Sequence, residues 1–185
     1  MMTKKSWYGF LLLLSILFCL VAQAGSAFAK DQKAAAAKIQ ALNDQIVASN
    51  EARDLPTALR AAEEAVQVAK EGYGKGSLQA ADTMNNLANL YLYIKRAPEA
   101  ERLYKKAILI DLGKLDKEGV EIAAIYFNLG VAYAMQKKYT TAIDILNKAF
   151  NIRLKKLGPD SVETKNVEQM IADLTKLAYP NEVKM

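Results

Sequence analysis

The sequence predicts an all-α solenoid, a row of stacked antiparallel helix pairs. One block recurs directly after itself, because residues 74–115 and 116–157 align without a gap. Within both blocks, apolar residues return at three- and four-residue steps, which is typical of helices. No stretch alternates with period two over a useful length, so no strand is expected. A fixed period in this range indicates stacked supersecondary units, which mostly expose a concave surface and seldom build a catalytic pocket.

Residues 1–29 predict a secretory signal peptide. Lys4 and Lys5 precede an apolar run at residues 11–22, and Ala27-Phe28-Ala29 fits the small-x-small cleavage rule. The run is shorter than the ~20 residues that comfortably span a bilayer, which favours cleavage and leaves no membrane span in the cleaved chain. The expected location is the bacterial periplasm or cell envelope. The alternative is an inner-membrane anchor through an uncleaved N-terminus.

Residues 30–73 predict a degenerate first repeat. Its polar, alanine-rich start at residues 30–37 is expected to be a frayed lead-in to a helix. A shift by one repeat length places Ala58 under Ala100, as a repeat requires. However, Ser49 occupies the position at which the later repeats have tyrosine.

Residues 74–115 predict the first clear helix pair, at 80–94 and 98–112. Pro98 fits the first turn of the second helix, where its missing N–H costs nothing. Residues 116–157 repeat this pattern. Ala88 and Gly130 occupy the equivalent positions in the two repeats, where the paired helices must approach closely. A larger side chain there would overpack the contact, at a cost of roughly 1–3 kcal/mol.

The C-terminal segment predicts half a repeat. Gly158-Pro159-Asp160 would begin a fourth unit, with a helix at residues 161–177, and Tyr179-Pro180 then ends it before a second helix can form. Residues 158–179 are therefore expected to be a capping helix, which solenoids need to cover an exposed apolar end. Residues 180–185 are left as a tail.

These small and aromatic positions on paired helices resemble the tetratricopeptide repeat, although the usual period of that family is shorter, at about 34 residues. The 42-residue spacing, the string at residues 84–91 (Met-Asn-Asn-Leu-Ala-Asn-Leu-Tyr) and the Leu157-Gly158-Pro159-Asp160 junction resemble the longer repeats of kinesin light chains and many bacterial proteins. The resemblance implies a right-handed superhelix of about three repeats plus the C-terminal capping helix.

The resemblance also implies an inner groove, lined by the first helix of each pair at five repeat positions. In the three repeats and the cap these positions are Gln40, Asn43, Asp44, Val47 and Asn50; Asp82, Asn85, Asn86, Asn89 and Leu92; Ala124, Phe127, Asn128, Val131 and Ala134; and Asn166, Gln169, Met170 and Asp173. The candidate peptide-binding residues among them are Asn85, Asn86, Asn89, Phe127, Asn128 and Val131.

The asparagines of this row need a physical reason. An amide side chain can both donate to and accept from a peptide backbone, yet asparagine is a poor helix former. Peptide recognition is one reason, and a hydrogen bond between repeats that fixes their stacking is the other. We favour recognition at Asn86 and Asn128 because they share one repeat position. Both alternatives stay open at Asn85 and Asn89.

Composition disfavours an enzyme. The chain has no histidine, and its single cysteine, Cys19, lies in the predicted signal peptide. Most general-base, triad and zinc chemistry is thereby removed, and we expect no metal site and no cofactor. The net charge of +5 comes from 25 basic and 20 acidic residues that interleave along the chain. This does not predict a nucleic-acid partner, which normally needs a clustered basic surface.

The expected partner is a protein or peptide segment. None of the groove positions is basic, which disfavours capture of a C-terminal carboxylate. Amides, acids and apolar side chains suit a neutral or mildly basic peptide instead. The predicted function is an exported interaction module, a scaffold, adaptor or assembly accessory. The alternative is a structural protein of the cell envelope that binds further copies of itself as a homo-oligomer.

Overall fold

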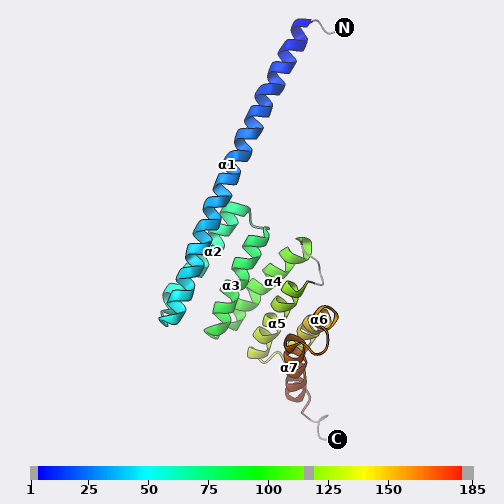
Figure 1. Ribbon diagram of the computed structural model, residues 1–185. Helices are drawn as coiled ribbons and strands as arrows, with labels where there is room; N and C mark the ends of the chain where they lie inside the picture. The colour runs from blue at the N-terminus through cyan, green and yellow to red at the C-terminus, as the bar shows by residue number, and fades with distance from the viewer. Residues whose placement is uncertain (1–3, 115–118, 181–185) are drawn as a thin grey trace.

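The fold is all-α, as predicted. The computed structural model describes residues 4–114 and 119–180, with side chains at 23, 25 and from residue 27 onward. All regular structure in these ranges is helical (Figure 1). The helices are α1 (Lys4–Glu51), α2 (Leu55–Tyr73), α3 (Leu78–Tyr93), α4 (Ala97–Lys114), α5 (Val120–Met135), α6 (Tyr139–Leu157) and α7 (Val162–Ala178).

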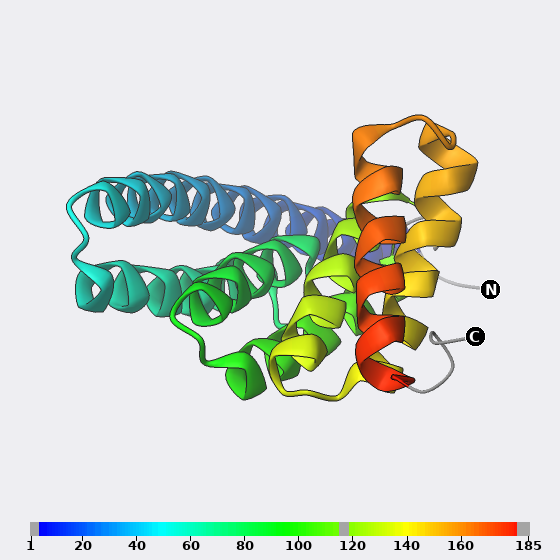
Figure 2. The same ribbon diagram turned by 90° about the horizontal axis from the view of Figure 1, so that it is seen from below.

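Each helix packs against the next one in the chain, from α1 on α2 to α6 on α7. The contact between α3 and α5 joins the first helices of two successive pairs. Figures 1 and 2 show the resulting array, with α1 at one end and α7 at the other. The predicted boundary at residues 115 and 116, and the predicted tail beyond residue 180, lie outside the described residues.

Helix α1 is continuous from Lys4 to Glu51 and extends well beyond the helix pairs (Figure 1). The expected frayed lead-in at residues 30–37 was therefore wrong. Ala35 is buried against α2, where a Cβ added to Gly72 would lie 2.4 Å from the Ala35 Cβ. This close approach orders the segment, and the sequence of α1 by itself does not reveal it.

The predicted signal peptide falls mostly on residues of α1 whose side chains lie outside the described part. Its cleavage after Ala29 stays a prediction. Among the residues that the structure describes, no helix is both long enough and apolar enough to cross a membrane.

The turns inside the three helix pairs repeat one backbone geometry. Arg53, Lys95 and Lys137 each have a positive φ, of 58°, 63° and 60°. In each turn, the N–H of the next residue donates to a carbonyl five residues back: Asp54 to Ser49 at 2.8 Å, Arg96 to Tyr91 at 2.7 Å and Lys138 to Tyr133 at 3.0 Å. These residues occupy equivalent repeat positions, so the first pair keeps the repeat geometry although its side chains have diverged.

Small residues make the helix crossings close, as predicted. Ala58, Ala100 and Ala142 are completely buried at equivalent positions. A Cβ added to Gly130 would lie 2.6 Å from Cγ of Leu146, a side chain that is also completely buried. Neither α5 nor α6 can therefore take a further methyl group at this crossing without moving.

Helix α7 covers the last pair. Its Val167 and Leu174 are buried in the main core cluster, together with Leu129 and Leu146 of α5 and α6. Ser161 caps the helix by accepting a hydrogen bond from the Thr164 N–H at 3.1 Å. The helix predicted at residues 161–177 is thus observed at Val162–Ala178.

Candidate peptide-binding surface

Three hollows lie between successive first helices of the repeats, α1, α3, α5 and α7, which we call the A helices. The first hollow lies between α1 and α3, the middle hollow between α3 and α5, and the last hollow between α5 and α7. About half of the residues that line them are positions that the repeat pattern assigned to an inner groove.

The first hollow has a volume of about 410 Å³. It is lined by Ile46 and Asn50 of α1 and by Asn86, Asn89, Leu90 and Tyr93 of α3. Asn86 is exposed, so its amide is accessible to a partner. Tyr93 is 72% exposed, so a large aromatic side chain stands beside these amides. Amides next to aromatic and apolar surface suit an extended peptide, because its backbone and its side chains can both be bound.

The last hollow has a volume of about 490 Å³ and joins α5 to the capping helix. Phe127 provides one wall, and Asn166, Gln169, Met170, Asp173 and Leu174 of α7 provide the other. The Arg153 guanidinium of α6 lies 5.0 Å from the centroid of the Phe127 ring and donates a hydrogen bond to the Glu163 carbonyl at 3.0 Å. The Phe127 ring therefore lies within cation–π distance of a guanidinium that is itself hydrogen-bonded to α7.

The middle hollow has a volume of about 590 Å³ and is the most acidic of the three. Asp82 and Asn85 come from α3, Asp111 from α4 and Glu121 from α5. The described residues that complete it are apolar or small: Leu78, Gly119, Ile122, Ala124 and Ile125. None of these described residues carries a positive charge.

Burial raises the pKa values of two carboxyl groups in this hollow. It raises the pKa of Asp111 to about 6, with a further contribution from the negative charge of Asp82. Burial also raises the pKa of Asp82. The described residues of this hollow thus provide neither carboxyl group with the opposite charge that ordinarily holds such a group ionised.

Two of the predicted recognition residues bond to each other. The Asn128 side-chain amide donates to Oδ1 of Asn89 at 3.0 Å, and the Tyr104 hydroxyl donates to the same oxygen at 2.6 Å. This network joins α3, α4 and α5. A hydrogen bond between repeats was one of the two roles considered for these asparagines. The sequence left this role open for Asn89, and it favoured peptide recognition for Asn128. Asn89 also lines the first hollow, so one residue both joins the repeats and contributes to the surface.

The structure therefore separates the six candidate residues. Asn86 and Asn89 lie in the first hollow, Asn85 in the middle hollow and Phe127 in the last hollow. Asn128 and Val131 line none of these three. A binding role for the six residues stays a prediction, because the arrangement of their side chains does not test it.

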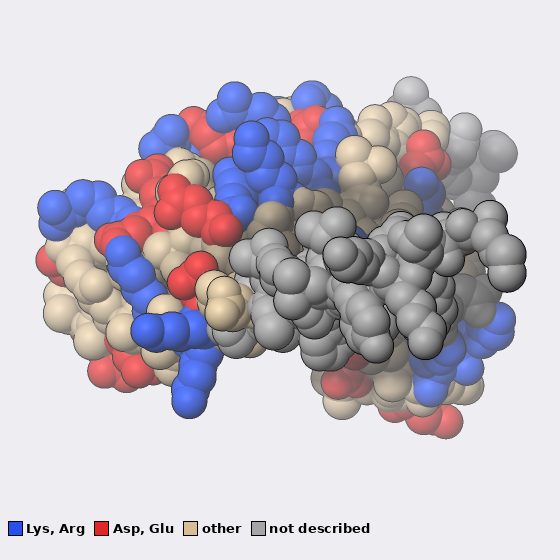
Figure 3. Space-filling model, turned by 90° about the horizontal axis from the view of Figure 1, so that it is seen from above, with Lys and Arg blue, Asp and Glu red and all other residues tan. Residues whose placement is uncertain are grey.

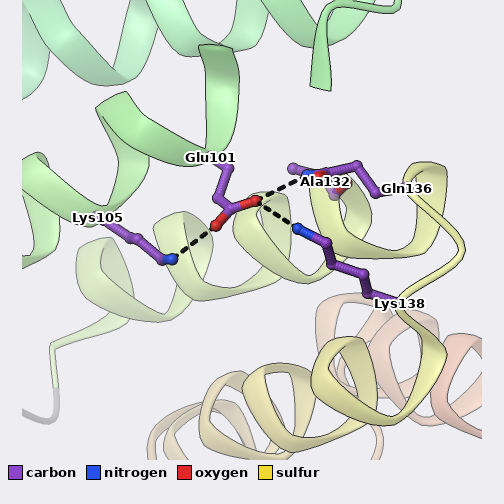
Figure 4. Close-up of polar contacts among 5 residues, drawn as sticks. All are labelled: Glu101, Lys105, Ala132, Gln136 and Lys138. Atoms are coloured by element: carbon purple, nitrogen blue, oxygen red, sulfur yellow. Dashed lines mark hydrogen bonds and ion pairs between the residues drawn. The ribbon is translucent and has the colours of Figure 1, made fainter. Parts of the chain in front are cut away.

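A separate polar cluster joins the second and third helix pairs. Glu101 of α4 accepts hydrogen bonds from Lys105 at 2.6 Å, from Gln136 at 2.9 Å and from Lys138 at 3.3 Å (Figure 4). Burial alone would raise the pKa of Glu101, but these three donors outweigh it and lower the pKa to about 2. Lys105 and Lys138 also lie 5.3 and 5.4 Å from the centroid of the Tyr133 ring. Gln136 also donates to the Ala132 carbonyl of α5 at 3.2 Å. The cluster thus connects the second and third helix pairs through one carboxylate.

Charges of both signs cover the surface elsewhere. Figure 3 shows Lys and Arg beside Asp and Glu on the described part of the face seen from above, so neither sign occupies that face alone.

Comparison with known proteins identifies the repeat. Models described as tetratricopeptide repeat match residues 37–111 and residues 122–163, which together are more than half of the chain. The chain is a tetratricopeptide repeat protein. The match that begins at residue 37 includes the diverged first pair, in agreement with the shared turn at Arg53.

Curated relatives of this tetratricopeptide repeat protein are much longer. It is 29% identical over 122 residues to a clustered mitochondria protein homolog of Ajellomyces capsulatus, covering 66% of the chain and 10% of that protein. A homolog with the same description from Coccidioides immitis is 28% identical over 114 residues, covering 62% of the chain and 9% of that protein. The chain thus spans about a tenth of the length of these relatives.

Solved structures support the fold of this repeat protein. BtubC (BKLC) from P. vanneervenii has a TM-score of 0.67 at 21% identity, over 85% of this chain and 65% of that one. A variant of a putative kinesin light chain from Podosopora anserina, with nearly identical TPR-like repeats, has a TM-score of 0.67 at 15% identity, over 98% and 91%. The TPR2B domain of yeast Sti1 in complex with pHsp70 has a TM-score of 0.58 at 20% identity, over 76% and 98%.

Sequence reasoning missed several residues of the hollows of this tetratricopeptide repeat protein. Leu90 and Tyr93 of α3 line the first hollow but lie outside the five assigned repeat positions. Asp111 belongs to the second helix of its pair, which the family pattern does not assign to the groove. One signal was available, because Asp111 interrupts the otherwise apolar run of Ile108, Ile110 and Leu112.

Proposed function

We propose that this protein is exported and binds an extended segment of a partner protein along its A helices. The three hollows are the observation that carries this proposal. Each of them contains groove positions from two successive repeats or from a repeat and the cap, so a single extended peptide could contact several in succession. Tetratricopeptide repeats serve as protein-interaction modules, and stacked repeats offer an extended surface for that purpose.

The chemistry of the hollows supports a particular kind of segment. The first and last hollows combine amide groups with Tyr93, Phe127 and Met170, which suits a peptide with apolar side chains. The middle hollow adds carboxyl groups and, among its described residues, no cation. The yeast Sti1 domain was solved with pHsp70, so an array of similar fold holds a partner in that case. The hollows described here suit a neutral or mildly basic segment.

The sequence of residues 1–29 supports export to the periplasm or cell envelope. Its basic start, its short apolar run and its Ala27-Phe28-Ala29 site form a signal-peptide pattern. Mass spectrometry of the N-terminus of the protein purified from its own cell envelope tests this part directly. A mature chain that begins at Lys30 supports it, and a retained Met1 in that fraction supports the anchored alternative.

The binding proposal is tested by affinity capture from a cell-envelope extract. The tagged chain is compared with Asn86→Arg, which places a long cation in the first hollow, and with Asn147→Arg as a matched control. Asn86 and Asn147 are both exposed on helices, and Asn147 lies on α6, outside the three hollows. Arginine is a good helix former, so neither substitution is expected to disturb its helix.

A partner that is retained by the wild type and by Asn147→Arg, but lost by Asn86→Arg, supports binding along the A helices. Equal retention by both variants would show that the partner binds elsewhere. If only the bait is recovered, self-assembly becomes the better function.

Self-assembly is favoured by one observation, the exposure of Val162 and Leu177 on the last helix. These two side chains lie near opposite ends of α7, and polar residues such as Lys165, Glu168 and Asp173 are exposed between them. A terminal helix with a mostly polar outer surface is typical of a cap that ends an array. We therefore place partner binding first, and light scattering across a concentration series distinguishes the two.

A further inference from the structure

Asp111 is a buried carboxyl group with one oxygen, Oδ1, that no described residue satisfies. Its side chain is 3% exposed, and Oδ1 receives no hydrogen bond from any residue that the structure describes. The same holds for Oδ1 of Asn85, which lines the same hollow. Buried acceptors of this kind are rare, because an unsatisfied polar group costs free energy unless something else provides a donor.

The surroundings make the negative charge still less favourable. Asp111 lies in the last turn of α4, where the helix dipole is negative, and Asp82 of α3 lines the same hollow. The first turn of α5 presents partial positive charge to this region, but Glu121 in that turn offsets it. Every element that lines the hollow thus contributes an acid, and none of its described residues contributes a base.

The rest of the wall is apolar. Leu78 of α3 and Ile122 and Ile125 of α5 line the hollow beside the carboxyl groups. A lysine or arginine side chain matches both the carboxyl groups and the apolar wall, because its charged end is carried on an aliphatic stem. A metal ion fits less well, since the described residues contain no group of three or more acidic or other ligating side chains placed to hold one.

We infer that the middle hollow is a binding site for one lysine or arginine side chain of the bound partner segment. The carboxyl groups of Asp111, Asp82 and Glu121 hold the cationic end, and the three apolar residues contact its stem. This inference rests on the proposed function, and it names the partner residue that the middle hollow selects.

The site should depend on pH. Burial and the charge of Asp82 raise the pKa of Asp111 to about 6, so this carboxyl group is largely protonated at pH 5 and ionised at pH 7.5. A cation binds the ionised form, and its affinity should therefore fall as the pH is lowered through this range.

The test is an NMR titration of the ¹⁵N-labelled full-length chain with small probes, which needs no knowledge of the partner. The probes are N-acetyl-arginine amide and N-acetyl-lysine amide, with N-acetyl-glutamine amide as the neutral control. Calcium chloride and magnesium chloride are titrated separately. The variants are Asp111→Asn and the pair Asp82→Asn with Glu121→Gln. The matched control pair is Asp144→Asn with Glu168→Gln, two exposed acids of α6 and α7 outside the hollow.

At pH 7.5, we expect the arginine or lysine probe to shift the backbone amides of Asp82, Asn85, Asp111 and Glu121. Loss of a charged hydrogen-bonding partner commonly costs tenfold in affinity, so Asp111→Asn should weaken binding about tenfold. Binding should also weaken at pH 5, and the control pair should match the wild type. Circular dichroism of each variant confirms that it is folded.

Equal shifts with the glutamine probe, or unchanged affinity in Asp111→Asn, would overturn the inference. Shifts of the same amides by calcium or magnesium but not by the organic cations would overturn it in favour of a metal site. If no probe binds in the titration but Asn86→Arg still loses the captured partner, only the cation site is rejected and the groove proposal stands. Conversely, a positive titration without any captured partner leaves a cation site and removes the groove proposal.

Discussion

At the scale of single residues, Asp111 and Glu101 are acids of one helix, α4, with opposite environments. Oδ1 of the buried Asp111 receives no hydrogen bond from the described residues, whereas Glu101 receives three hydrogen bonds from Lys105, Gln136 and Lys138. The first environment raises a carboxyl pKa to about 6 and the second lowers one to about 2. The two residues therefore make contributions of opposite sign to the pH dependence of stability.

Asp111→Asn should stabilise the fold at pH 7, because it removes a buried charge that no described residue pairs with. The folded pKa of about 6 lies above the ordinary value for aspartate, so this group costs stability above pH 6 and the cost disappears as the pH falls towards 4. We expect a gain of about 1–2 kcal/mol in the free energy of unfolding at pH 7. Urea unfolding between pH 4 and pH 8 measures it. A loss of stability in the variant would show that Asp111 holds the fold together.

Glu101→Gln should have the opposite effect. Its folded pKa of about 2 lies below the ordinary value for glutamate, so its contribution is present above about pH 4.5 and is lost as the pH falls towards 2. We expect a loss of about 1 kcal/mol at pH 7, modest because the lysine partners are half exposed. Urea unfolding at pH 7 and pH 2.5 tests this, with the exposed Glu168→Gln as control. Equal losses at both pH values would contradict an origin in the charge.

At the scale of the helices, Gly130 and Gly113 distinguish a close crossing from an open surface. A Cβ on Gly130 would lie 2.6 Å from Cγ of Leu146, whereas a Cβ on Gly113 of α4 would meet nothing within 4 Å. Alanine is the better helix former at both positions. Only packing can therefore make the two substitutions differ.

Gly130→Ala should destabilise the protein by about 1–2 kcal/mol, because overpacking at a buried crossing exceeds the gain in helix propensity. Gly113→Ala should stabilise it slightly, by up to about 1 kcal/mol. Melting temperatures of the two variants provide the comparison. Similar values for both would mean that α5 and α6 can separate at little cost, contrary to their packing.

The helices were predictable where the sequence repeats, and less predictable where contacts with another helix determine whether a segment is ordered. The predicted helix at 80–94 and the observed α3, Leu78–Tyr93, agree closely because periodicity determines an amphipathic helix. Residues 30–37 were predicted to be frayed because they are polar and rich in alanine. Their order comes from Ala35, which packs on Gly72 in a different helix.

The candidate surface was predictable in outline for a similar reason. Repeat positions determine which side chains share the A-helix surface, so about half of the residues that line the hollows were named beforehand. The hydrogen bond between Asn89 and Asn128 depends on the distance between α3 and α5. The spacing of residues along one helix does not predict that distance. The participation of Asp111 likewise depends on where the end of α4 meets α3 and α5.

At the scale of the whole molecule, α7 covers the apolar end of the array. Leu174 is 7% exposed in the core, and Leu177 on the same helix is 58% exposed. These two leucines are the same residue type, one buried and one exposed. Substitutions at these two positions therefore measure how strongly the last helix holds to the array.

Leu174→Ala should cost about 2–4 kcal/mol, because it removes buried apolar volume where α7 meets the last pair. Leu177→Ala should change stability by less than about 0.5 kcal/mol. Thermal unfolding provides both values, and hydrogen exchange shows whether α7 opens before the other helices. Equal effects of the two substitutions would mean that α7 is not docked as described.

The positive-φ turns at Arg53, Lys95 and Lys137 make the array modular. Since one turn geometry recurs once in every repeat, residues 96–137 run from one such turn to the next and amount to one repeat length. A second copy of residues 96–137 placed directly after Lys137 would follow a turn with the same geometry as the turn at Lys95, which it ordinarily follows. The chain would gain one helix pair and one further hollow. In the new pair α5 would pack on the copied α4 instead of α6, through equivalent repeat positions, so the binding surface could be lengthened in steps of one repeat.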